Sequence, residues 1–107
     1  MAKKPLEILT ESMFYVLLSL LGGAKCGTEI AAFVSARTEQ RVLLGPGTLY
    51  TILAKFEEEK LICETQVEGR RRIYQITEKG YGLYRAELER LRACVRDAED
   101  EEGRMQA

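Results

Sequence analysis

The residues best suited to chemistry lie in two neighbouring stretches, and their types favour recognition over catalysis. Residues 45–61 read GPGTLYTILAKFEEEKL, and helical spacing would turn four of their side chains outward: Thr48, Tyr50, Thr51 and Lys55. A second run holds three consecutive arginines, Arg70, Arg71 and Arg72. Hydroxyl groups can hydrogen-bond to base edges and guanidinium groups can bind phosphates, so together they predict contact with a nucleic acid.

The same sequence argues against an enzyme or a metal site. There is no histidine, and no carboxylate, lysine or tyrosine stands in a motif that would orient it for acid–base work. Gly45-Pro46-Gly47 lacks the lysine pattern of a phosphate-binding loop. The cysteines, Cys26, Cys63 and Cys94, are odd in number and far apart, which fits a reducing cytoplasm and neither a zinc site nor a disulfide scaffold. We therefore expect no cofactor.

Two elements must position the recognition residues. A helix over residues 45–61 would bury Leu49, Ile52, Leu53 and Phe56, with Gly45 as N-cap and Pro46 as its first residue. Alternating runs at 61–67 and 72–77 predict a hairpin whose tip, residues 68–71, is basic. A helix followed at once by a basic hairpin is typical of a winged helix-turn-helix, a reader of duplex DNA.

The motifs GPGTLYTILAKFEEEKLI and EGRRRIYQITEKG resemble the core of the PadR family of bacterial transcriptional regulators, over about residues 6–98. The resemblance implies a dimeric winged-helix repressor whose N-terminal and C-terminal helices form the interface. It also implies a small, often aromatic, effector that releases DNA. The residues carried over are Thr48, Leu49 and Tyr50 in the helix, and Gly69, Arg70 and Arg71 in the wing. Two departures limit the resemblance: Cys26-Gly27-Thr28 in place of His-Gly-Tyr, and Thr51 in place of proline. The first removes an aromatic residue and a histidine near the implied dimer interface, which argues against copying the family's effector chemistry.

The DNA-binding set predicted from both arguments is Gly47, Thr48, Tyr50, Thr51, Lys55, Arg70, Arg71 and Arg72. Lys25, Arg37 and Arg41 are further candidates for phosphate contacts, with solvated surface charge as the alternative for each. The formal net charge is only −1, so a basic tip on a nearly neutral body would need two half-sites. We therefore expect double-stranded DNA with a palindromic operator.

The remaining elements predict a dimer. Thr10 would cap a first helix, apolar nearly all round, that ends at Gly22-Gly23; a second helix would span 27–37, and Leu43 or Leu44 would plug the core from the following turn. A last helix over 78–99, with Thr77 as its cap, shows a heptad seam that suits another chain, although it could instead fold back on its own domain. The predicted interface residues are Phe14, Leu17, Leu18, Tyr81, Tyr84, Leu88, Leu91 and Val95.

The sequence thus predicts a mainly α protein with a small β-hairpin: a winged helix-turn-helix over 1–77, a C-terminal dimerisation helix over 78–99, and an acidic flexible tail over 100–107. No apolar run is long enough for a membrane span, and the N-terminus lacks the features of a signal peptide, which favours the cytoplasm. The predicted function is a sequence-specific repressor. The alternative is a winged-helix module for protein–protein assembly that does not read DNA.

Overall fold

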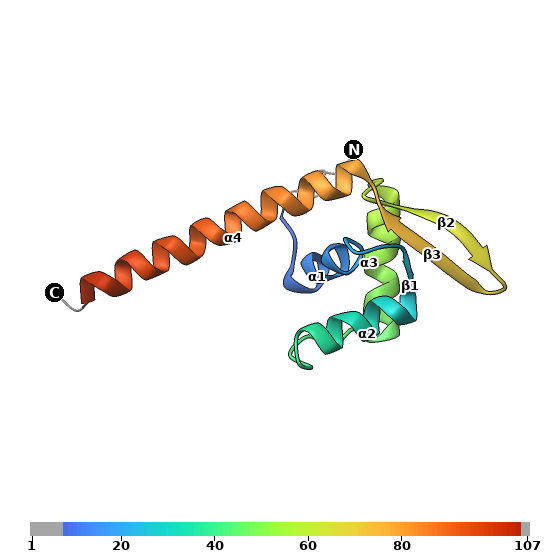
Figure 1. Ribbon diagram of the computed structural model, residues 1–107, viewed down its shortest axis with the longest axis horizontal. Helices are drawn as coiled ribbons and strands as arrows, with labels where there is room; N and C mark the ends of the chain where they lie inside the picture. Colours follow the sequence, from blue (N-terminus) through green and yellow to red (C-terminus); the bar gives the residue numbers. More distant parts are fainter. Residues whose placement is uncertain (1–7, 106–107) are drawn as a thin grey trace.

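The computed structural model describes residues 8–105, except for the side chains of residues 67 and 68, and it confirms the mainly helical winged-helix fold. The elements are α1 (Glu11–Ser19), β1 (Lys25–Cys26), α2 (Gly27–Arg37), α3 (Pro46–Glu58), β2 (Ile62–Glu68), β3 (Arg71–Ile76) and α4 (Glu78–Met105). Figure 1 shows that the β2–β3 hairpin, called the wing below, extends on the side of the domain opposite to α4.

The core lies between α1, α2, α3 and the start of α4. The predicted inner stripe of α3 is confirmed, because its apolar side chains are all buried: Leu49, Ile52, Leu53 and Phe56. From α1 and α2 they meet Val16, Leu17, Ile30 and Val34, each with no exposed surface. Burying these side chains together removes apolar surface from water, and this packs α1 and α2 against the inner face of α3. The outer face of α3 stays exposed.

The sheet has one strand more than the predicted hairpin. Lys25 and Cys26 pair antiparallel with Tyr74 and Ile73, which gives the strand order β1-β3-β2. Two residues are too few to show the alternation of a strand in the sequence. This short strand joins the wing to the start of α2.

The helix limits differ from the predicted ones at both ends of the chain. Thr10 caps α1 as predicted, because its Oγ1 accepts a hydrogen bond from Met13 N at 3.2 Å. However, α1 ends at Ser19, before Gly22-Gly23, because the N–H groups of Leu20 and Leu21 bond three residues back, in a tighter turn than an α-helix.

In the turn between α2 and α3, Leu44 packs on the core as predicted and Leu43 is 67% exposed. Val42, whose burial the sequence pattern did not indicate, is buried there as well.

At the other end of the chain, α4 continues to Met105, so the predicted helix end at residue 99 is wrong. An ion pair lies within the extension, between Arg104 and Glu101 at 3.6 Å, one turn apart on the helix. The last turns, residues 97–105, are mainly acidic and have no apolar stripe. Residues 106 and 107 of the predicted tail lie outside the described residues, as do residues 1–7 of the predicted domain.

Candidate nucleic-acid interface

The outer face of α3 carries most of the predicted DNA-binding residues. Gly47, Thr48, Tyr50 and Thr51 are all exposed, on the side of the helix away from the core. Gly45 is the N-cap and makes no side-chain hydrogen bond, and Pro46 occupies the first turn. The first N–H groups of the helix therefore face outward without a capping side chain, which suits an anion.

The two threonines of this face differ in what they can offer. The Thr51 hydroxyl donates to the Gly47 carbonyl at 2.9 Å, so its proton is already used and its outward chemistry is that of an acceptor and a methyl group. The Thr48 hydroxyl is exposed one turn closer to the helix N-terminus. Lys55 lies further along and pairs with Glu59 at 3.2 Å, which partly neutralises it.

The wing is a hairpin with a shorter tip than predicted. Glu68 pairs with Arg71, so only Gly69 and Arg70 form the turn, and Gly69 has a φ of +61°. Such a φ favours glycine at this position. The ladder is irregular between Glu64 and Gln66, where Thr65 is the extra residue, and a bulge of this kind bends the strand.

The three wing arginines differ in their surroundings. Arg70 is exposed at the tip. Arg71 reaches back to the start of α2, where its Nη2 lies 3.2 Å from Cys26 Sγ and 3.5 Å from Glu29 Oε1. Arg72 lies 3.7 Å from Glu64 Oε2 on the neighbouring strand. The arginine run is therefore split between an exposed tip and two side chains that help to hold the wing.

Cys26 occupies the junction between the wing and α2. Its side chain is buried and shares a hydrogen bond of 3.2 Å with the Thr28 hydroxyl. That hydrogen bond, helped by the Glu29 backbone and by Arg71, lowers the pKa of the Cys26 thiol against the raising effect of burial. Glu29 Oε1 accepts a hydrogen bond from Cys26 N at 2.9 Å, and this contact lowers the pKa of the Glu29 carboxyl.

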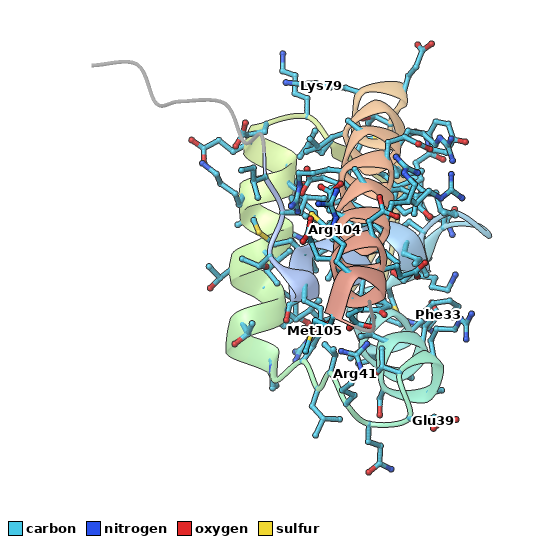
Figure 2. All side chains as sticks on the ribbon, turned by 90° about the vertical axis from the view of Figure 1, so that its left-hand side faces the viewer. Phe33, Glu39, Arg41, Lys79, Arg104 and Met105 are labelled. Carbon is cyan, nitrogen blue, oxygen red and sulfur yellow. The ribbon has the colours of Figure 1, made fainter. Side chains whose placement is uncertain are left out.

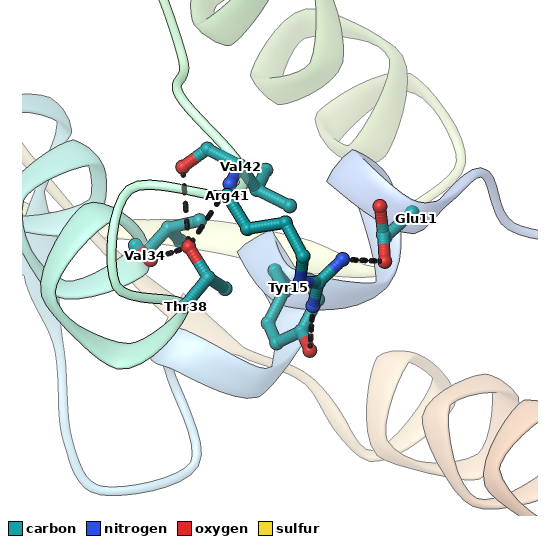
Figure 3. Close-up of polar contacts among 6 residues, drawn as sticks. All are labelled: Glu11, Tyr15, Val34, Thr38, Arg41 and Val42. Atoms are coloured by element: carbon teal, nitrogen blue, oxygen red, sulfur yellow. Dashed lines mark hydrogen bonds and ion pairs between the residues drawn. The ribbon is translucent and has the colours of Figure 1, made fainter.

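Two of the three further candidates for phosphate contacts, Arg41 and Lys25, already form contacts within the domain. Arg41 bonds to Glu11 and, at 3.0 Å, to Tyr15 Oη, and Figure 3 shows its guanidinium turned toward α1. In Figure 2 Arg41 and Glu39 lie at one end of the domain and Lys79, at the start of α4, at the other. Lys25 Nζ donates to Ser19 O at 2.6 Å and sits 5.1 Å from the centre of the Phe33 ring. Arg37, at the end of α2, is exposed.

Some of the predicted interface residues are buried within their own chain, and others are exposed. Leu17 is fully buried in its own chain, and Tyr84 is buried with its ring stacked on Phe14 at a centroid distance of 5.2 Å. The exposed fraction is 48% for Tyr81, 37% for Leu91 and 55% for Val95, while Leu18 and Leu88 are half-buried. α4 thus packs on α1 around Tyr84, whereas Leu91 and Val95, further along the seam, are uncovered.

Glu87 is a structurally important residue that sequence reasoning missed. It is 3% exposed, and its Oε2 accepts a hydrogen bond from Leu9 N at 2.8 Å. Arg90 donates to both carboxylate oxygens, at 3.0 and 3.1 Å, and lowers the pKa of Glu87. The spacing gave a signal, because Glu87 lies three residues after Tyr84 and four before Leu91, on the apolar face.

A cavity of about 310 Å³ lies beside this contact, between α1 and α4. It is lined by Leu9, Thr10, Glu11, Phe14, Tyr15, Glu87, Arg90 and Leu91. Among the described residues no helix could cross a membrane, and no cluster of cysteine and carboxylate side chains could hold a metal ion.

Comparison with known proteins agrees with this geometry. The sequence pattern of the transcriptional regulator PadR-like family matches residues 16–90, which contain α2, α3 and the wing. No functionally curated protein matches the sequence.

Solved structures with the same fold include a transcriptional regulator from Clostridium thermocellum, 24% identical, with a TM-score of 0.75 over 83% of this chain and 87% of that one. RosR from H. salinarum is 20% identical, with a TM-score of 0.67 over 89% and 96% of the two chains. The circadian clock associated protein Pex from Anabaena is 24% identical, with a TM-score of 0.58 over 85% and 88%. At these identities the likeness concerns the fold.

Proposed function

Because the chain belongs to the PadR-like family of transcriptional regulators, which are DNA-binding regulators and not enzymes, we propose that it is a repressor that binds a palindromic operator as a homodimer. In this proposal α3 enters the major groove and the wing lies along the adjacent backbone. The observation that carries it is the outer face of α3, where Gly47, Thr48 and Thr51 are exposed beside the basic wing. A helix in a major groove needs such small polar side chains near its N-terminal end.

The homodimer is supported by the bare half of the α4 seam. Leu91 and Val95 are exposed on α4, which extends away from the body of the domain (Figure 1), and with Leu88 they line a groove of about 420 Å³. Apolar side chains in a heptad pattern pack against another helix when one is present. A second copy of α4 supplies that helix, and the two copies of α3 then face two half-sites. We leave Leu17 out of this interface because its own core already covers it.

An effector is supported by the cavity between α1 and α4. Phe14, Tyr15 and Leu91 give it an aromatic and apolar lining, and it lies next to the proposed dimer face. A small aromatic or hydrophobic molecule bound there would favour one relative placement of the two helices, and hence of the two DNA-reading faces. A regulator of this kind acts where the chromosome is, so we place it in the cytoplasm, where its three free thiols stay reduced.

The experiment is selection of bound duplexes from a random pool, followed by footprinting on the selected sequence. The proposal expects a palindromic site with half-sites about one helical turn apart, and lower transcription from a promoter that overlaps it. Binding that never rises above that of the unselected pool would contradict sequence-specific recognition. Selected sites that raise transcription would contradict the repressor role only.

A further inference from the structure

A hollow of about 90 Å³ opens between α2, α3 and the wing, beside the face of α3 that we assign to the major groove. Its rim is formed by Thr28 in the first turn of α2, Tyr50 of α3, and Arg71 and Arg72 of β3. A water molecule needs roughly 10–15 Å³ of such space, so the hollow has room for a group of several oxygen atoms. Thr28 and Tyr50 are both exposed, so the hollow can be reached from outside.

The contacts around the hollow keep its donors in place. Cys26 Sγ lies 3.2 Å from Thr28 Oγ1 and 3.2 Å from Arg71 Nη2, so one buried sulfur holds the hydroxyl and the guanidinium side by side. Either atom can donate in the contact between Cys26 and Thr28, and when the neutral thiol donates, the Thr28 proton is free for a phosphate oxygen. A side chain at Gly27 would touch Tyr50, because an added Cβ would lie 3.5 Å from the tyrosine Oη. Two hydroxyl groups and two guanidinium groups from three elements therefore surround one small space, at the positive end of α2.

We propose that this hollow binds one phosphate group of the DNA backbone, with Thr28 as a contact residue that the sequence did not indicate. The inference rests on the proposed function, because it needs α3 and the wing to lie on the same duplex. Hydroxyl and guanidinium donors are the usual partners of backbone phosphates, and such contacts fix the register of a reading helix. Thr28 would thus help to determine how deeply Thr48 enters the groove.

Charge favours a phosphate of DNA over a free phosphate ion. Glu29 lies 3.5 Å from Arg71, and Glu64 lies 3.7 Å from Arg72, so the hollow is close to neutral. A free anion would gain little there, whereas a phosphate in a duplex is brought to the hollow by all the other contacts of α3 and the wing. Inorganic phosphate, at constant ionic strength, should therefore not compete with the duplex.

The first test compares Thr28→Glu with Ala36→Glu in the full chain. Both place one negative charge at an exposed position of α2, and at residue 28 the charge also suits the helix N-terminus, so the fold is kept. Only Thr28→Glu would repel a phosphate in the hollow. We expect it to weaken binding to a duplex by on the order of tenfold or more relative to Ala36→Glu. Equal affinities of the two variants would overturn the proposal.

The second test removes the hydroxyl alone. Thr28→Val should weaken duplex binding several-fold, and Thr28→Ser should restore it, because serine keeps the donor. A valine variant that binds as the wild type does would exclude the hydroxyl contact. Wild-type binding is measured first: a wild-type chain that fails to bind any duplex contradicts the proposed function, whereas unaltered binding by both Thr28 variants contradicts only the phosphate site. Competition by inorganic phosphate at millimolar concentration would mean a general anion site and would also overturn the assignment to DNA.

Discussion

The Glu87 carboxylate accepts a hydrogen bond from the backbone N–H of Leu9 at 2.8 Å, so the α4 helix holds the segment just before α1 from 78 positions away. Arg90 compensates the charge of Glu87 from the next turn. Replacing Glu87 with alanine would leave a buried N–H without its acceptor and should lower the free energy of unfolding by about 1–3 kcal/mol. Asp97→Ala, at an exposed position of the same helix, should change it by less than about 0.5 kcal/mol. Urea unfolding of both variants measures the difference.

The same contact predicts a pH dependence. The pKa of Glu87 is lowered in the folded chain, mainly by the hydrogen bonds from Arg90. The stabilisation is therefore present above the ordinary pKa of a carboxyl group, and it is lost as the pH falls through the lower pKa of the folded state. The wild type should lose more stability on acidification than Glu87→Gln does. Identical acid profiles would show that the ionised carboxylate adds nothing to the fold.

A glycine at the start of α4 gives a further prediction. A Cβ at Gly80 would lie 2.0 Å from the Leu61 carbonyl oxygen, which is backbone and cannot turn aside, whereas nothing lies within 4 Å of a Cβ at Gly82. Gly80→Ala should destabilise the chain by about 3 kcal/mol or more, because α4 must move away from the sheet. Gly82→Ala should be neutral or stabilise it by up to about 1 kcal/mol. Thermal unfolding of the two variants is the measurement, and equal melting temperatures would contradict the close approach.

Sequence patterns predicted the elements with long periodic signals and missed contacts made by single residues. Leu49, Ile52, Leu53 and Phe56 are spaced as one helix face, so the orientation of α3 followed from the sequence. Strand β1 has only two residues, and its pairing with Tyr74 depends on the tertiary fold. The end of α4 was misplaced because its last turns have no apolar stripe, which was the signal used to predict this helix.

The candidate DNA-binding site was likewise predicted only where a sequence pattern marks it, and not where packing places single side chains. The arginine run indicated the wing, but it could not show that Arg71 would turn back to Cys26 while Arg70 stayed exposed at the tip. That distinction depends on where α2 begins relative to β3. The close approach of these two segments in space, which brings Thr28 to the wing, is set by the core packing and by β1.

The exposed tip of the wing predicts a change in the salt dependence of binding. Arg70 is exposed at the turn, so Arg70→Ala should leave the melting temperature unchanged. It should weaken binding to all duplexes and reduce the slope of log affinity against log salt by about one for each phosphate that the side chain binds. Arg104→Ala, which removes an exposed charge from the end of α4 far from the wing, serves as the control. An unchanged slope for Arg70→Ala would place this side chain off the DNA.

The bare half of the α4 seam predicts where the dimer can be broken. Val95→Arg places a charge in the proposed interface, and Ala86→Arg places the same charge at an exposed position on another face of α4. Val95→Arg should shift sedimentation toward the monomer without lowering helix content, because Val95 is already 55% exposed in the single chain. Ala86→Arg should remain a dimer. If both variants sediment as dimers, the chains associate through another surface.

The last prediction concerns the two threonines of α3, because their hydrogen bonds differ. The Thr51 hydroxyl already donates to Gly47 O, so it has no proton left for a base, whereas the exposed Thr48 hydroxyl can donate or accept. Thr48→Ala should therefore reduce the discrimination between the selected operator and scrambled DNA by about 1–3 kcal/mol, and Thr51→Ala by less. Neither side chain belongs to the core, so the fold and non-specific binding should persist. Competition binding at one fixed salt concentration measures both ratios. A larger loss for Thr51→Ala would mean that its methyl group, packed on a thymine, reads the sequence instead.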